Sequence, residues 1–216
     1  TDVNLRSYAA SAQQNQYQRY LERADDPNIR RQQLRFSYVW ELPVGKGHAL
    51  LPNLPTVPNL LLSGWQLSGI TSMMTGPLLS PGFSGVDPAN TNQFSGRPDR
   101  VGNGNLDSGS MRDRIKNRQP IFDSSAFVRP AAGRGYYGNS ARSILTGPGN
   151  MSWNAVASKN FYFKERARFQ FRCEAFNVFN RANFSSPGTN INSGSFGLVT
   201  AAGSGRALLM GLRLDY

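Results

Sequence analysis

Hydrophobic side chains occupy every second position over residues 32–43. The even positions of this segment carry Leu34, Phe36, Tyr38, Trp40 and Leu42. The odd positions between them are mostly polar and include Arg35 and Glu41. Because successive side chains of a strand point to opposite faces, this period of two predicts a β-strand with one apolar face and one polar face.

Four further segments, residues 64–76, 152–163, 166–176 and 206–216, show the same alternation. Residues 166–176 are the most regular, with Phe169, Phe171, Cys173 and Ala175 between Arg168, Gln170, Arg172 and Glu174. In the last segment the apolar positions are Leu208, Met210, Leu212, Leu214 and Tyr216, opposite Arg213. Lys159 is an exception on an apolar face, and we expect it near a rim where its stem can snorkel.

The predicted strands are long, and their connections are unequal. Each spans about 10–13 residues, above the usual 5–6 or so of soluble sheets and near the roughly 9–11 of a membrane-spanning strand. Lys164 and Glu165 alone separate the third and fourth strands, whereas residues 77–151 and 180–205 form long loops without predicted structure. Short turns at one end and long loops at the other are typical of outer-membrane barrels. Residues 45–61 lie on the short-turn side and are longer than this pattern expects.

Composition narrows the class of protein. The chain has 216 residues, of which 39% are hydrophobic and 11% aromatic. No window supplies the 18 or so consecutive apolar residues of a membrane-spanning helix, and a disordered chain would carry fewer aromatic residues. Cys173 and His48 are the only residues of their kinds, which excludes a disulfide framework and most metal or proton-relay sites. We therefore predict no enzymatic activity, no catalytic residues and no cofactor.

The net charge is +11, and much of the positive charge lies in the first long loop. The basic residues assigned to this loop are Arg97, Arg100, Arg112, Arg114, Lys116 and Arg118. They could contact lipopolysaccharide phosphates or an anionic ligand, or simply be solvated. No nucleic-acid-binding module is recognisable, so nucleic acid is not an expected partner.

Two short motifs are better explained as loops. Residues 133–138 satisfy G-x-G-x-x-G but lack the preceding strand and following helix of a dinucleotide site. Residues 103–109 loosely match a calcium loop, but Arg114 stands where the bidentate Glu belongs.

Five ordered motifs carry a resemblance to a known family. They are LRFSYVWELPVGKG (residues 34–47), GWQLSGITSMMTG (64–76), GYYGNSARSILTGPG (135–149), WNAVASKNF (153–161) and RFQFRCEAFNVFNRANF (168–184). Together they resemble the C-terminal end of TonB-dependent outer-membrane receptors, of the Oar-like, carboxypeptidase-regulatory-domain type. The likeness runs from about residue 25 to residue 216.

The resemblance implies an all-β fold: an antiparallel transmembrane β-barrel segment, the last five or so strands of a barrel of about 22. Residues 1–29 would precede the first of these strands, and residues 30–216 would hold the strands and their extracellular loops. The implied partners are the rest of the barrel, an internal plug domain, the TonB energy complex, outer-membrane lipid and an unknown ligand. Because five strands cannot close a barrel, we expect the chain to be part of a longer protein or of an assembly.

Two residue sets follow from the strand faces within such a barrel. Leu208, Met210, Leu212, Leu214 and Tyr216 match the C-terminal signal that barrel-assembly machinery reads. The expected lumen-facing polar residues are Arg35, Glu41, Arg168, Arg172, Glu174 and Arg213. The leading hypothesis is energised uptake of a ligand. A structural or adhesion barrel and a soluble basic polyanion-binding module remain alternatives.

Overall fold

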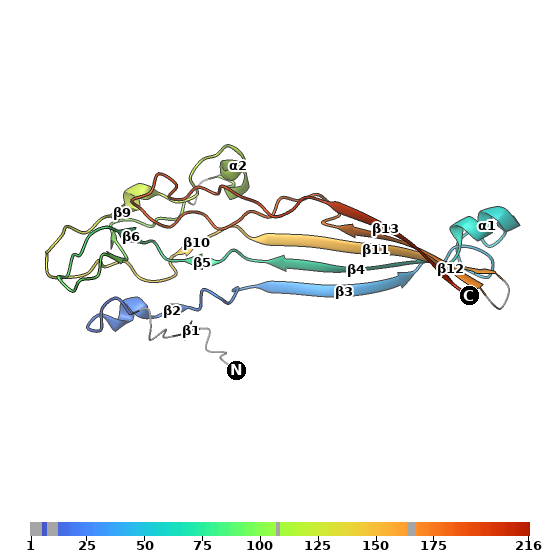
Figure 1. Ribbon diagram of the computed structural model, residues 1–216, viewed down its shortest axis with the longest axis horizontal. Coiled ribbons are helices and arrows are strands. Elements are labelled where there is room, and N and C mark those ends of the chain that lie inside the picture. Colours follow the sequence, from blue (N-terminus) through green and yellow to red (C-terminus); the bar gives the residue numbers. More distant parts are fainter. Residues whose placement is uncertain (1–5, 8–12, 107–108, 164–166) are drawn as a thin grey trace. The chain divides into compact units, whose positions relative to one another are not determined.

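Five long strands form one sheet in this computed structural model, which describes residues 6–7, 13–106, 109–163 and 167–216. They are β3 (Gln33–Glu41), β4 (Trp65–Met74), β11 (Asn150–Phe163), β12 (Ala167–Phe176) and β13 (Ala207–Asp215). Their order in the sheet is β13-β12-β11-β4-β3, so strands that follow one another among these five along the chain are also neighbours in space (Figure 1). All five predicted strands are confirmed, each within two residues of the expected bounds.

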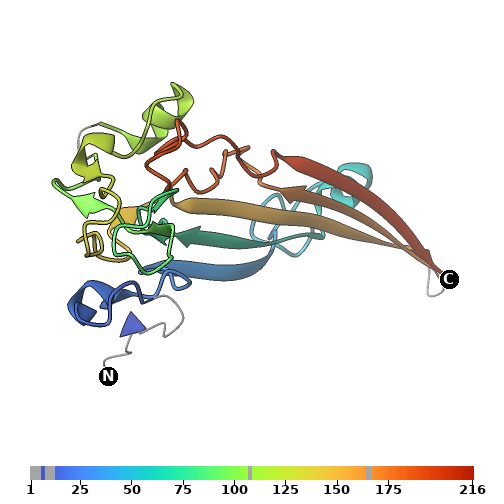
Figure 2. The ribbon, with the colours of Figure 1, turned by 60° about the vertical axis from the view of Figure 1, so that its left-hand side comes forward.

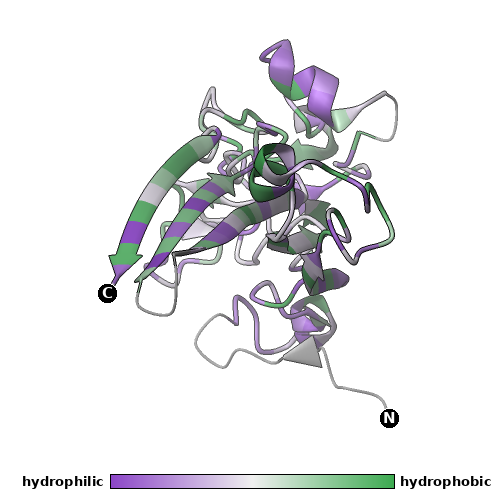
Figure 3. Cartoon of the chain, turned by 90° about the vertical axis from the view of Figure 1, so that its right-hand side faces the viewer, coloured by the Kyte–Doolittle hydropathy of each residue, from purple (hydrophilic) through white to green (hydrophobic). Residues whose placement is uncertain are grey.

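The register of the sheet keeps like faces together. Antiparallel pairing sets Ala157 opposite Cys173, and Cys173 in turn opposite Met210. On the other face Arg168 lies directly opposite Asp215. Since a slip of one residue would mix the two faces, the apolar pattern of each strand fixes this register. Figure 3 shows the resulting alternation of hydrophobic and hydrophilic residues along the strands.

The connection between β3 and β4 contains a helix that the sequence pattern did not predict. This helix, α1 (Thr56–Leu62), follows Pro55 and ends at Ser63. Pro58 is its third residue, where a missing N–H costs nothing because the first N–H groups of a helix have no partner within it. The predicted turn at Lys164 and Glu165 lies outside the described residues.

The remainder of the chain folds into a unit of its own. Residues Thr1–Gln32, Met74–Asn150 and Asn183–Gly203 form this loop unit, and residues Gln33–Met73, Met151–Ala182 and Ser204–Tyr216 form the sheet unit. The prediction that 77–151 is without structure is therefore wrong. Figure 2 shows the coils and short arrows that make up this unit.

Short elements give the loop unit its framework. Its helices are α2 (Met111–Lys116) and the 3-10 turns η2 (Arg19–Glu22) and η3 (Ser124–Ala126). Its paired strands are β1 (Arg6–Ser7) with β2 (Ala24–Asp25), β5 (Leu78–Leu79) with β10 (Leu145–Thr146), β6 (Phe83–Ser84) with β7 (Ser95–Gly96), and β8 (Asp99–Arg100) with β9 (Phe127–Val128).

A hydrophobic core joins the two long loops, which the sequence treated as separate. Its buried residues are Ile115, Ile121, Phe122, Ala126, Phe127, Leu145 and Phe196. The ring of Phe196, from the second loop, lies 5.9 Å from the rings of both Phe122 and Phe127. The Ile121 N–H donates to the Gly197 carbonyl at 2.9 Å, which ties the backbones together as well.

Candidate functional site

The apolar face of the sheet is exposed on its two edge strands, β3 and β13. Its exposed side chains on β3 and β13 include Leu34, Phe36, Trp40, Leu208, Met210, Leu212 and Leu214. Within the described residues, every buried hydrophobic side chain belongs to the loop unit and none to the sheet unit. A soluble sheet would cover such a face with another layer, because apolar area in water is unfavourable. The arrangement suits contact with acyl chains.

Both edges of the sheet are open. Across the described residues β3 and β13 each pair with a single neighbour, and most of their residues are exposed. Unpaired strand edges are not tolerated in the hydrocarbon of a bilayer, so further strands must continue this sheet. The residues predicted to form the assembly signal, Leu208 to Leu214, lie on β13, and Tyr216 follows this strand, fully exposed.

The opposite face carries the charged side chains of β12 and β13, and these pair with one another. Arg168 Nη2 lies 2.6 Å from Asp215 Oδ2 on the neighbouring strand, and Arg213 Nε donates to the other oxygen of Asp215 at 2.7 Å. Arg172 Nε donates to Glu174 Oε1 at 2.6 Å. Four of the expected lumen-facing residues, Arg168, Arg172, Glu174 and Arg213, therefore form ion pairs within the sheet. Arg35 and Glu41 lie exposed on the edge strand β3.

A shallow groove runs across strands β3, β4, β11 and β12. It has a volume of about 350 Å³ and is lined by Ser37, Val39, Ser68, Ile70, Asn154 and Glu174, among others. Several of its lining residues are small. One of them is Gly69, on the apolar face, where a Cβ would lie 2.5 Å from the Tyr38 hydroxyl oxygen. Sequence reasoning did not anticipate this contact.

The comparison with known families agrees with these features. The family described as an outer membrane beta barrel domain matches residues 2–208. The chain belongs to this family. The protein is thus an outer-membrane β-barrel protein, and the soluble alternative is set aside. No curated protein and no solved structure matches the chain.

Lys159 is a charged residue on the apolar, lipid-facing side of this barrel sheet. We expected it to snorkel, but its side chain is buried, with 2% of the residue exposed. Its Nζ donates to the carbonyl oxygens of Leu61, at 3.1 Å, and Ser63, at the end of α1. It also lies 5.7 Å from the centre of the Trp65 ring. The helix supplies acceptors that the bilayer lacks.

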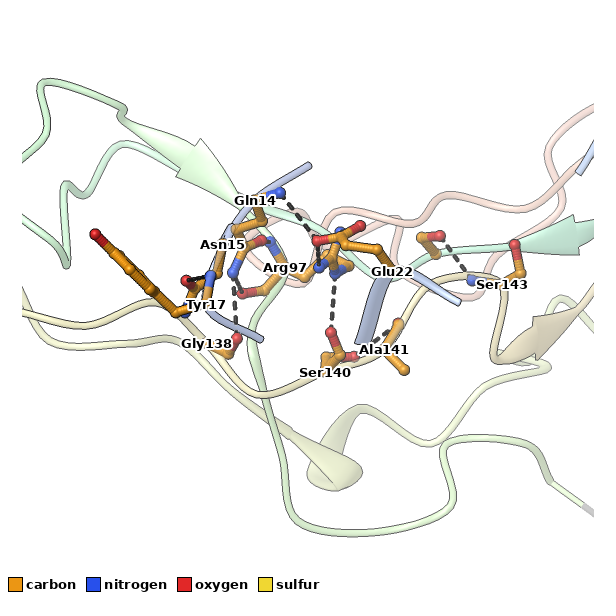
Figure 4. Close-up of polar contacts among 10 residues, drawn as sticks. Gln14, Asn15, Tyr17, Glu22, Arg97, Gly138, Ser140, Ala141 and Ser143 are labelled. Carbon is orange, nitrogen blue, oxygen red and sulfur yellow. Dashed lines mark hydrogen bonds and ion pairs between the residues drawn. The ribbon is translucent and has the colours of Figure 1, made fainter. Parts of the chain in front are cut away.

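The structure corrects the role of Arg97 in the basic loop. Arg97 is buried, and its guanidinium forms an ion pair with Glu22, which is itself buried. Its Nε donates to the Ser140 carbonyl at 2.8 Å. Figure 4 shows Gln14 pointing into the same cluster, where its side chain bonds to Arg97 and its own N–H to Glu22. Arg97 holds three segments of the loop unit together and is not accessible to an anionic ligand.

The other five basic residues lie nearer the surface. Arg100, Lys116 and Arg118 are exposed, whereas Arg112 and Arg114 on α2 are partly buried, with Arg112 5.3 Å from the centre of the Phe184 ring. A further arginine, Arg134, pairs with Asp99. Its hydrogen bond to that carboxylate raises the pKa of Arg134 above its ordinary value. Internal pairing thus removes part of the loop's apparent positive charge.

Proposed function

We propose that this outer-membrane barrel chain is the C-terminal barrel part of a TonB-dependent transport receptor. In this proposal the protein binds a ligand outside the cell and takes it up with energy delivered through TonB. No covalent chemistry is involved, and no residue of the chain acts as a catalyst.

The supporting observation is the polar face of the sheet. The charges of β12 and β13 pair within the sheet, and Ser37, Ser68 and Asn154, together with apolar neighbours such as Val39 and Ile70, line a groove that the sheet does not fill. Small barrels fill their interior with side chains from their own strands, whereas the widest transporters enclose a separate plug. An open, polar inner face suits a wide barrel with a body inside it.

The exposed basic residues suggest where anionic groups would meet the protein. Arg100, Lys116 and Arg118 belong to the loop unit and are accessible. In the proposed receptor they contact lipopolysaccharide phosphates or an anionic ligand on the outer side.

The decisive experiment uses the full-length protein purified in detergent, with the periplasmic domain of TonB from the same organism as the probe. A transport receptor forms a complex with this domain, measured by calorimetry, and loses it when the TonB box at its start is deleted. If the intact protein binds no TonB domain, the barrel is a structural or adhesion protein instead.

A further inference from the structure

The connection between β3 and β4 has an unusual surface. Its exposed aliphatic side chains are Leu50, Leu51, Val57, Leu60, Leu61 and Leu62, and each has 48–67% of its surface accessible. No residue of α1 is buried. A short helix in a water-soluble protein is held by burying its apolar side chains, so this helix must be held by something else.

Polar contacts of the backbone hold α1 in place. The Leu61 carbonyl accepts hydrogen bonds from Trp65 Nε1, at 2.9 Å, and from Lys159 Nζ. The Asn59 side chain accepts the N–H of Lys46 at 2.9 Å. A Cβ on Gly45 would lie 2.5 Å from the Cβ of Ser63, so the preceding loop packs closely on the helix end.

These contacts connect α1 to the lipid-facing side of the sheet. Lys159 lies opposite Phe171 in the register, on the same face as Cys173 and Phe169. The Trp65 ring lies 5.9 Å from the Phe171 ring on that face. The aliphatic side chains of α1 therefore continue a surface that already faces acyl chains, at the end of the sheet where the chain also ends (Figure 1).

The composition of this region favours lipid over protein as the partner. No Asp, Glu, Lys or Arg occurs between residues 47 and 86. The exposed side chains of this connection include the six aliphatic ones together with Lys46, His48, Asn53 and Thr56. Apolar side chains beside a few polar and basic ones suit the boundary at which acyl chains meet lipid headgroups, and the backbone carbonyls near Lys159 are already satisfied.

We propose that α1 and the loop before it form a membrane-interface anchor that inserts into the phospholipid leaflet at the short-turn end of the barrel. Lys159 locks the anchor onto the barrel wall through the last carbonyls of the helix. The anchor depends on the barrel lying in a bilayer and is independent of whether the protein transports anything.

The test places a nitroxide label on α1 of the full-length protein, in a background without other cysteines that includes Cys173→Ser. The protein is reconstituted in vesicles of phosphatidylethanolamine and phosphatidylglycerol. Collisions of the label with oxygen, which concentrates in lipid, and with a water-soluble nickel complex are measured. Val57→Cys carries the label on α1, and Val101→Cys is the control, because both valines are 67% exposed.

The label at position 57 is expected to collide mainly with oxygen, and the label at position 101 mainly with nickel. Nickel-accessible labels at both positions would overturn the proposal in favour of a solvated helix. A position-57 label shielded from both reagents would overturn it in favour of a protein partner or a second copy of the chain.

A second variant tests whether the hydrogen bonds of Lys159 hold α1 on the sheet. Lys159→Met keeps the aliphatic stem but removes the ammonium, and the label at position 57 should become several-fold more mobile. Lys46→Met is the matched control, since only the backbone of Lys46 bonds to α1. Equal mobility in the Lys159→Met variant and the unsubstituted background would show that Lys159 does not hold the helix.

Discussion

The loop unit and the sheet unit of this chain are built on opposite principles. The loop unit buries phenylalanines and leucines, together with the Glu22–Arg97 ion pair. In the described part of the sheet unit the buried side chains are all polar, namely Thr71, Lys159 and Asn177, and leucines are exposed. Regular secondary structure is richer in the sheet unit, yet the residues described in this unit form no hydrophobic core. The difference shows that the solvent, water for one unit and lipid for the other, decides which side chains a fold hides.

We expect the largest loss of stability from a substitution in the hydrophobic core of the loop unit. Phe122→Ala removes a ring that is 2% exposed and should lower the stability of the unit by about 3–5 kcal/mol. Hydrogen exchange of loop-unit amides in the full-length protein would measure the loss. Phe94→Ala, at a position that is 57% exposed, is the control and should change stability by no more than about 0.5 kcal/mol. Equal effects at the two positions would mean that the unit has no true core.

We expect the second-largest loss of stability from breaking the buried ion pair between Glu22 and Arg97. Glu22→Ala leaves the Arg97 guanidinium without its carboxylate, which should cost about 3 kcal/mol, at the low end because the bond to Ser140 remains. Glu174→Ala breaks the more exposed pair with Arg172 and should cost at most about 1 kcal/mol. The same exchange experiment reads the first variant, and denaturant unfolding in vesicles reads the second. A Glu22→Ala protein as stable as the parent would show that the pair is not desolvated.

Two glycines of the sheet unit, Gly69 and Gly211, should differ by a smaller amount in how much an alanine substitution lowers stability. Gly69→Ala places a methyl group 2.5 Å from the Asn154 carbonyl oxygen, and we expect a loss of about 1–3 kcal/mol as the strands shift. Gly211→Ala, where no atom lies within 4 Å of the new Cβ, should be close to neutral. Denaturant titration of the full-length protein in vesicles compares the two, and a neutral Gly69→Ala would contradict the close approach of Tyr38.

The sequence was sufficient to predict the sheet because alternation is a local signal. The strands and their two faces follow from a period of two. The core around Phe122 and Phe196 was missed since irregular segments have no period, and their contacts join residues far apart in the chain. Arg97 looked like other loop arginines, because nothing near it in sequence reveals Glu22. The helix α1 was missed because its seven residues are too few to show a helical period.

Lys159 shows how a local exception can point to a distant contact. A charge on an apolar face predicted some compensation, and snorkelling was the simplest choice. In the structure the ammonium instead donates to two carbonyls at the C-terminal end of α1. The charge of Lys159 on an apolar face correctly indicated that this residue has a special contact. The carbonyls of α1 that accept its hydrogen bonds could be identified only from the structure.

The central claim is that one face of the sheet meets lipid and the other does not. The most direct test compares Leu212→Arg with Leu209→Arg, two leucines on opposite faces of β13, by measuring the folding free energy of the full-length barrel into vesicles. Leu212→Arg should cost about 2–4 kcal/mol, as charges near the bilayer midplane do in other barrels, while Leu209→Arg should leave the free energy nearly unchanged. A larger loss at Leu209 than at Leu212 would contradict the assignment of the faces.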